Sequence, residues 1–391
     1  MTPETYAKVL ELNLLRRSVA DQSGSPSDME RLVTLERELA AVKANAKPDP
    51  DATILNNRVQ PRLLGPETTG LEVNVSLNMA QVPTSIAHIL DSEETPLVTA
   101  SVSYVGAPAG NTSFEIKRVR VSSFIEGYSA HSITTLELRR GAKAIPVRQL
   151  PTLFPHRVAS LTELTLATLN VKIEHLDSKE LELQTTKNIW LLPRTTAVLE
   201  IKDPSTGKWK DLSRYLAAYV TPNDPEVMQF LTKAKAKLAT RAFVGYQLPR
   251  EGVDAQVEAL FNALKEAGVS YVNSVIAFGD ADSATVQRVR LPRESLHAKN
   301  ANCIDGVVLF ASLFEAISMN ASIVLVSGHA LVGWQAWPDG EWKYLETTMV
   351  GSEPFAAACH SGQMTVKQFG DLRNEVSLPE ARTKYRITPM A

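Results

Sequence analysis

The sequence is poor in cysteine and lacks long apolar runs. Its 2 cysteines, Cys303 and Cys359, exclude a disulfide framework and favour a reducing compartment or a catalytic thiol. No stretch approaches the ~18 consecutive apolar residues that a membrane-spanning helix needs. Glu4, Lys8 and Glu11 interrupt the first apolar residues, which is not typical of an export signal. We therefore expect a cytoplasmic protein without a membrane partner.

The chain also lacks a marked excess of charge of either sign. Its 41 Lys and Arg residues nearly balance 43 Asp and Glu residues, so there is no global electrostatic footprint for nucleic acid. The notable basic run, formed by Lys233, Lys235, Lys237 and Arg241, is typical of a solvated helix face. We expect no nucleic-acid partner. The composition is that of a globular protein, and the length predicts two or three domains.

Residues 1–45 predict a helical hairpin. A break at Ser23-Gly24-Ser25-Pro26 precedes Ser27 and Glu30, a capping-box pair. Apolar residues then follow at helical spacing: Leu32, Leu35, Leu39 and Val42. This stripe either packs on the rest of the protein or forms an interface with a partner. Residues 46–70 are proline-rich with few apolar residues, which predicts a linker or an extended wrap.

Residues 71–220 predict an antiparallel β-sandwich of the immunoglobulin-like kind. Apolar and polar residues alternate from Leu71 to Leu77, and the same period of two returns near residues 114–121, 169–173 and 198–201. Four histidines are scattered here without the spacing of metal ligands: His88, His131, His156 and His175. They are interpreted as surface or structural residues. The sandwich is a second surface on which a protein partner could be recruited.

Residues 221–391 predict a mixed domain, so the whole chain is expected to be α+β. Helices are expected over residues 226–243 and 254–266, and strands over residues 322–326 and 341–345. Apolar residues recur at helical spacing directly after Cys303: Val307, Val308, Ala311, Phe314 and Ile317. Cys303 is therefore predicted to begin a buried helix.

The start of a helix suits a reactive thiol. It carries positive potential and free N–H groups, and both favour the thiolate, which is the nucleophilic form of cysteine. The backbone N–H of Cys303 is also in a position to help hold an oxyanion.

A base and an acid follow this cysteine in the sequence. His329 comes just after the apolar residues 323–326, where a returning strand would place it opposite the helix N-terminus. Glu346 ends the next predicted strand, beyond a hairpin turn at residues 337–340. Adjacent antiparallel strands would bring Glu346 to the far ring nitrogen of His329, where a carboxylate orients the imidazole and stabilises its charged form.

This order of residues resembles the transglutaminase-like superfamily, which has the papain-like fold. The motifs are Asn302-Cys303-x-Asp305, Gly328-His329-Ala330-x-x-Gly333 and Glu346-x-Thr348. They look like the bacterial branch, and the resemblance covers about residues 220–365. It implies Cys303 as nucleophile, His329 as general base and Glu346 as orienting acid, although many members have Asp in the third place.

The resemblance implies a thiol protease or amidase that acts on a protein or peptide substrate without a cofactor. Three alternatives stay open. The first is an inactive or autoinhibited scaffold that binds a partner protein. The second is a regulated protease, with residues 46–70 as an inhibitory wrap or a cleavage site. The third is a crosslinking transglutaminase, which is less favoured because the sequence shows no loop with calcium-ligand spacing.

Other residues near the motifs are weaker candidates. Gln287 and Asn302 are candidate oxyanion donors, but Gln287 also fits a structural strand residue and Asn302 a helix cap. Trp334 either walls a substrate groove or lies in the core. Asp305 is interpreted as a first-turn acid favoured by the helix dipole, and Cys359 as a structural thiol. We expect no metal site.

Overall fold

The computed structural model describes residues 70–390, except 107–115, 178–180, 204–205, 248–250 and 274–283, and four residues before them: Arg31, Thr34, Arg37 and Glu38. The predicted hairpin and proline-rich linker thus lie almost wholly outside the described residues. Mixed helices and sheets confirm the α+β class. None of the helices in the described part is long and apolar enough to cross a membrane.

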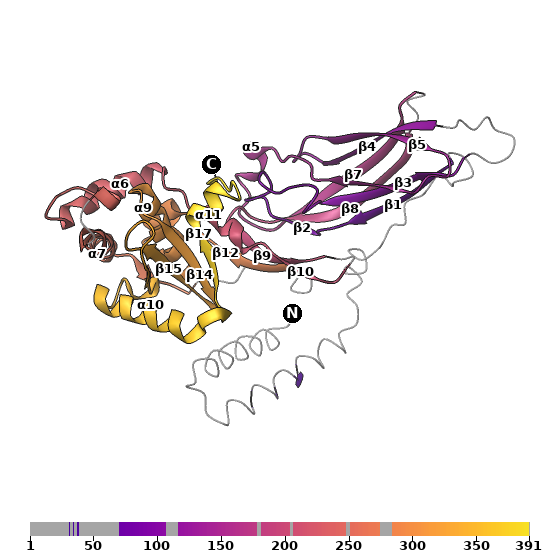
Figure 1. Ribbon diagram of the computed structural model, residues 1–391. Helices are drawn as coiled ribbons and strands as arrows, with labels where there is room; N and C mark the ends of the chain where they lie inside the picture. Colours follow the sequence, from indigo (N-terminus) through magenta and orange to yellow (C-terminus); the bar gives the residue numbers. More distant parts are fainter. Residues whose placement is uncertain are drawn as a thin grey trace. The chain divides into compact units, whose positions relative to one another are not determined.

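Two sheets make up most of residues 71–191 (Figure 1). The three-stranded sheet has the order β1-β3-β6, with β1 Leu71–Leu77, β3 Val98–Tyr104 and β6 Ile145–Gln149. The five-stranded sheet has the order β2-β8-β7-β4-β5, with β2 Gln81–Val82, β8 Leu181–Leu191, β7 Thr165–His175, β4 Ile116–Ile125 and β5 Ser132–Arg139. A short helix, α5 (Pro155–Val158), precedes β7.

The two sheets share their cores. Val102 of β3, Val121 of β4 and Ile173 of β7 are fully buried in one cluster. The alternation predicted near residues 71–77 is present, because every second side chain of a strand points to the same face. Over residues 169–173 the apolar side chains are buried as predicted, but Asn170 between them is buried as well. The immunoglobulin-like arrangement of these two sheets stays a prediction.

A small sheet joins residues on both sides of the predicted domain boundary near residue 220. Strand β9 (Thr196–Lys202) pairs with β10 (Trp209–Asp211) and also with β12 (Ala284–Arg288), which lies far later in the chain. Both pairings are antiparallel, and the second has a register shift between Thr285 and Val286. Backbone hydrogen bonds therefore connect the two parts of the sequence directly.

The C-terminal part contains a four-stranded antiparallel sheet with the order β16-β15-β14-β17 (Figure 1). Its strands are β14 Ala321–Val326, β15 His329–Gln335, β16 Trp342–Leu345 and β17 Asn374–Ser377. The α-helices are α6 Pro225–Ala234, α7 Glu251–Glu266, α8 Pro292–Ala298, α9 Cys303–Ala316, α10 Phe355–Phe369 and α11 Leu378–Thr383. Shorter elements are the 3-10 turns η1 Ser213–Tyr219, η2 Lys235–Lys237, η3 Gly245–Gln247, η4 Thr347–Met349 and η5 Gly370–Leu372, and the parallel pair β11 Ser270–Tyr271 and β13 Asn300–Ala301.

The helix expected over residues 226–243 is shorter than predicted. It ends at Ala234, passes into the turn η2, and reaches extended backbone at Leu238. The buried residues Val227, Leu231 and Ala234 mark the face of α6 that packs on the core. Lys235 and Lys237 are exposed, so little packing stabilises a further helical turn there.

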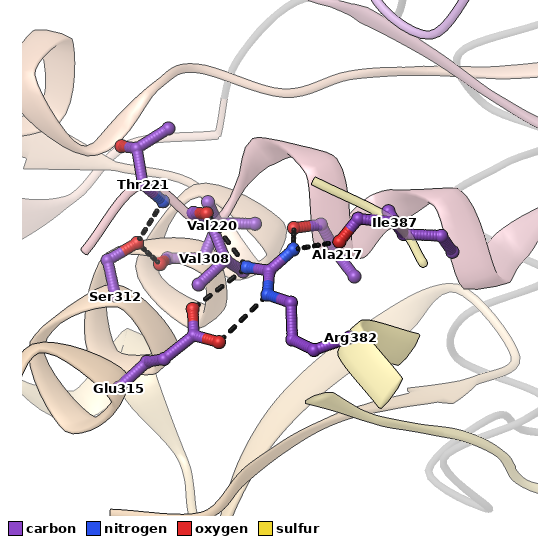
Figure 2. A network of polar contacts seen from close by, with 8 residues as sticks. All are labelled: Ala217, Val220, Thr221, Val308, Ser312, Glu315, Arg382 and Ile387. Atoms are coloured by element: carbon purple, nitrogen blue, oxygen red, sulfur yellow. Dashed lines mark hydrogen bonds and ion pairs between the residues drawn. The ribbon is translucent and has the colours of Figure 1, made fainter. Parts of the chain in front are cut away.

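Helix α9 is the centre of the C-terminal core, since every residue from Ile304 to Phe314 is buried. At its C-terminal end, Glu315 accepts two hydrogen bonds of 2.8 Å from the guanidinium of Arg382. Figure 2 shows that Arg382 also donates to the carbonyl oxygens of Ala217, Val220 and Ile387. This arginine therefore ties the last helix of the chain to α9 and to the segment that includes η1.

Candidate active site

Cys303 is the first residue of α9, as the sequence predicts. Asn302 caps the helix: its Oδ1 accepts a hydrogen bond of 2.8 Å from the amide of Asp305. In return, Asp305 Oδ2 accepts from the amide of Asn302 at 3.2 Å. This reciprocal capping box satisfies two of the amides that a helix start leaves without intrahelical partners. Cys303 itself is partly exposed.

Asp305 also holds the segment that leads from β12 to α8. Its Oδ1 accepts a hydrogen bond of 2.7 Å from the amide of Arg290. Its side chain is fully buried, and burial raises the pKa of Asp305, against the opposing effect of its hydrogen bonds from Arg290 and Asn302. Asp305 thus fixes the start of α9, in agreement with its interpretation as a structural first-turn acid.

His329 begins β15, directly after the turn at Ser327 and Gly328 that joins it to β14. Its Nε2 lies 2.6 Å from Oε2 of Glu346, and Cys303 lies close enough to the ring to affect its pKa. Burial lowers the pKa of His329, but its interactions with Cys303 and Glu346 raise it to about 10. The imidazole is therefore held in its charged form at neutral pH.

Glu346 directly follows β16, the strand that pairs with β15. Its side chain is buried, and its Oε1 accepts hydrogen bonds from the amide of Thr348 at 3.1 Å and from Thr348 Oγ1 at 2.5 Å. Burial opposes ionisation, but the hydrogen bonds and charge of His329, followed by the bonds from Thr348, lower the pKa of Glu346 overall. One oxygen is thus fixed by Thr348, which leaves the other for His329.

Thr347 brings the turn after Glu346 against the start of α9. Its hydroxyl donates a hydrogen bond of 3.4 Å to the carbonyl oxygen of Cys303. A Cβ built on Gly306 would meet Thr347 Oγ1 at 2.7 Å and Thr347 Cβ at 3.0 Å, so only glycine allows this approach. Gly306 and Thr347 lie beside or within the sequence motifs. A contact between such distant segments leaves no periodic signal in the sequence.

Replacing Gly306 with alanine is expected to slow the alkylation of Cys303 at pH 7 by roughly 3- to 10-fold. The added methyl would push Thr347 away from the start of α9 and disturb the contact between Cys303 and the His329 imidazolium, which stabilises the reactive thiolate form. The loss of stability should stay near the ~1–3 kcal/mol of an overpacked site. Iodoacetamide kinetics and urea unfolding would measure the two effects. Thr347→Ala in the same chain removes the clashing hydroxyl and should restore part of the rate; a wild-type rate in the single variant would contradict the expectation.

The remaining candidates lie in different settings. Gln287 is on β12, where its Nε2 donates to the carbonyl oxygen of Arg288 at 3.0 Å. Asn302 is engaged as the cap of α9. Trp334 does not wall a groove, because only 2% of it is exposed and its ring packs between Phe314 and Phe355. Its indole N–H donates to Asp254, which satisfies the polar atom of a core tryptophan.

Cys359 lies on α10, a different helix from the one that Cys303 begins. Burial and the charge of Asp254 raise the pKa of Cys359 to about 12. Within the described ranges, no group of three or more His, Cys, Asp or Glu residues is placed to hold a metal ion. Cys303, His329 and Glu346 bring a thiol, an imidazole and a carboxylate to one place.

Comparisons with known proteins add little to this geometry. No protein-family model matches the chain, and no curated protein matches it. Among solved structures, one described as a "putative protease" from Parabacteroides distasonis aligns over 72% of this chain, with 11% sequence identity and a TM-score of 0.27. The alignment covers 66% of that chain, slightly less than two thirds. A likeness with so low a TM-score carries no argument about fold or function.

Proposed function

We propose that this chain is a cysteine-dependent hydrolase, a protease or amidase of the transglutaminase-like superfamily, with Cys303, His329 and Glu346 as its catalytic triad. The observation that carries the proposal is the position of His329. Its ring lies between Glu346, at 2.6 Å, and Cys303, which stands at the start of a buried helix. A thiol, an imidazole and a carboxylate thus follow one another in the order that the triad logic requires.

The proposed reaction has two halves. The Cys303 thiolate attacks the carbonyl carbon of a peptide or carboxamide, and the carbonyl electron pair moves to oxygen. The tetrahedral intermediate then collapses, the C–N bond breaks, and the leaving amine takes the proton of the His329 imidazolium. The acyl group stays on Cys303 as a thioester. Water, deprotonated by neutral His329, attacks this thioester and releases a carboxylic acid and the starting Cys303–His329 pair.

Each supporting residue has a defined part in these steps. Glu346 accepts a hydrogen bond from Nε2 of His329, which leaves Nδ1 as the ring nitrogen for the Cys303 thiol. The backbone N–H of Cys303 is the first oxyanion donor. The amide of Gln287 is the second candidate, and it would have to leave the carbonyl of Arg288 to serve.

The partial exposure of Cys303 favours an enzyme over a scaffold in which the thiol is covered. The same triad would serve a crosslinking transglutaminase if an amine instead of water attacked the thioester. Hydrolysis is preferred because it needs no second substrate. Incubation with casein in H₂¹⁸O tests this choice: hydrolysis places one ¹⁸O in each new carboxylate, whereas transfer to an added amine places none.

The thiol test is the first measurement for the proposal. We expect iodoacetamide to label one site below pH 7, with Cys303→Ala unlabelled and Cys359→Ala labelled like the wild type. The reasons are the charged imidazole beside Cys303 and the burial that raises the pKa of Cys359 to about 12. Intact-mass detection counts the labels. Labelling of Cys303 only above pH ~8.5, the range of an ordinary thiol, would contradict the proposal.

A further inference from the structure

A groove of about 600 Å³ lies between α6, α7 and α8, outside the candidate active site. Its volume is within the range of about 300–1,000 Å³ that is usual for ligand pockets. Half-buried Phe230 of α6 and Leu296 of α8 give it an apolar floor. Small residues on α6 and α7, such as Ala234 and Ala263, line it as well, which leaves room for a side chain of a bound molecule.

The charged residues of this α6–α8 groove are unevenly distributed. Arg293 near the start of α8 lies 3.5 Å from Asp224, the N-cap of α6, so both helices begin close together. Lys233 and Lys299 line the groove near or just beyond the C-terminal ends of these helices. Glu226 lines it in the first turn of α6, roughly 10 Å along the helix from Lys233 at a rise of 1.5 Å per residue.

The two lysines are available to a ligand. Both are exposed, and among the residues that the structure describes neither forms an ion pair with a carboxylate. Lys237, also on the lining, is neutralised by Glu266 at 2.5 Å. The basic run that the sequence suggests to be a solvated helix face is therefore divided: Lys233 faces a concave surface together with a lysine from another helix.

The groove is also close to Cys303 along the chain. Lys299 is followed by Asn300, Ala301 and Asn302, and then by Cys303 at the start of α9. Even a fully extended chain of this length spans no more than about 14 Å. The Cα atoms of Lys299 and Cys303 therefore lie within about 14 Å of each other.

We propose that the α6–α8 groove is a docking site for an acidic segment of the protein substrate, with an apolar side chain against Phe230 and Leu296 and carboxylates at Lys233 and Lys299. The inference rests on the proposed function for the role of the bound segment, but the binding itself requires no chemistry at Cys303. Charge complementarity then selects substrates before cleavage, because opposite charges steer and orient the encounter.

The test uses the full chain with Cys303→Ala, so that nothing is cleaved. The probe is a fluorescein-labelled pool of 12-residue peptides of Asp, Glu, Leu, Phe, Ser and Gly, measured by anisotropy at low salt. A matched pool with Asn and Gln in place of Asp and Glu reports the part of binding that is independent of charge. Charge reversal at Lys233→Glu and Lys299→Glu is compared with Lys208→Glu and Lys367→Glu, two exposed lysines outside the groove.

We expect the acidic pool to bind and the reversal at Lys233 and Lys299 to weaken it by about tenfold or more. The Lys208 and Lys367 reversal should change the affinity by less than about twofold. The proposal is overturned if no acidic peptide binds at 1 mM (a ceiling on the order of weak docking affinities), if the neutral pool binds equally well, or if both double variants behave alike. Failure of the proposed function would instead appear as slow alkylation of wild-type Cys303, which this binding measurement does not involve.

Discussion

Replacing His329 with alanine is expected to slow alkylation of Cys303 at pH 7 by roughly 10- to 30-fold, because an ordinary thiol is only about 3% ionised at that pH. In the wild type a charged imidazole lies beside Cys303, and alanine removes it. Iodoacetamide alkylates the thiolate, the form that a neighbouring cation stabilises. Stopped-flow or quenched iodoacetamide kinetics on the Cys359→Ala background would report Cys303 alone. His131→Ala is the matched control and should leave the rate unchanged. His131 directly precedes β5, and its ring stacks on Phe124.

The expected pH dependence of hydrolysis follows from the direction of two pKa shifts. The pKa of His329 is raised to about 10, so its charged form is complete well below that pH and is lost as the pH rises through it. The pKa of Glu346 is lowered, so its carboxylate is lost only in more acid solution than usual. Hydrolysis should therefore persist into alkaline pH and then fall near 10. A fall near pH 6.5, the ordinary value for histidine, would show that Glu346 does not hold the imidazolium.

Replacing Arg382 with methionine is expected to lower the free energy of unfolding by about 3 kcal/mol or more. The change leaves Glu315 as a mostly buried carboxylate without its cation, and breaking one partner of such a pair usually costs ~3–5 kcal/mol. Three carbonyl oxygens, those of Ala217, Val220 and Ile387, lose a donor at the same time (Figure 2). Urea unfolding monitored by tryptophan fluorescence would measure the loss.

The control for Arg382 is an exposed arginine that also pairs with a carboxylate. Arg118 contacts Asp177 on the surface, with side chains 53% and 48% exposed. Water and salt screen exposed pairs of this kind, so Arg118→Met should cost far less. Adding Glu315→Met to Arg382→Met should recover part of the loss, because it removes the unpaired charge. Equal losses for the Arg118 and Arg382 variants would rule out the network as a source of stability.

The sequence predicted the elements whose pattern is local. Apolar residues after Cys303 repeat at helical spacing, and they form α9 because one long stretch of that period has a single good way to be buried. The strands that carry His329 and precede Glu346 are joined by a short hairpin, so their pairing was also within reach. These local patterns are sufficient to anticipate that the three residues meet.

Local sequence patterns do not predict contacts between distant segments. Strand β9 ends at Lys202 and pairs with β12, which begins only at Ala284. The alternation within each strand does not indicate which other strand it pairs with. Gly306 lies in the helical stretch after Cys303, and its close contact with Thr347 leaves no trace in the local pattern. The predicted end of α6 lies too late in the chain. Lysine and alanine favour helix, but few buried contacts remain after Ala234 to stabilise a further turn.

The pairing of β9 with β12 has a consequence for any shortened form of the protein. A fragment that starts at residue 221 would keep β12 but lose the strand that satisfies its backbone amides and carbonyls. It would also lose the carbonyl oxygens of Ala217 and Val220 that Arg382 contacts. An exposed strand edge of this kind readily pairs with other chains. Separate expression of the thiol-bearing half is therefore expected to give aggregates, and insertion or recombination near residue 220 would be poorly tolerated during evolution.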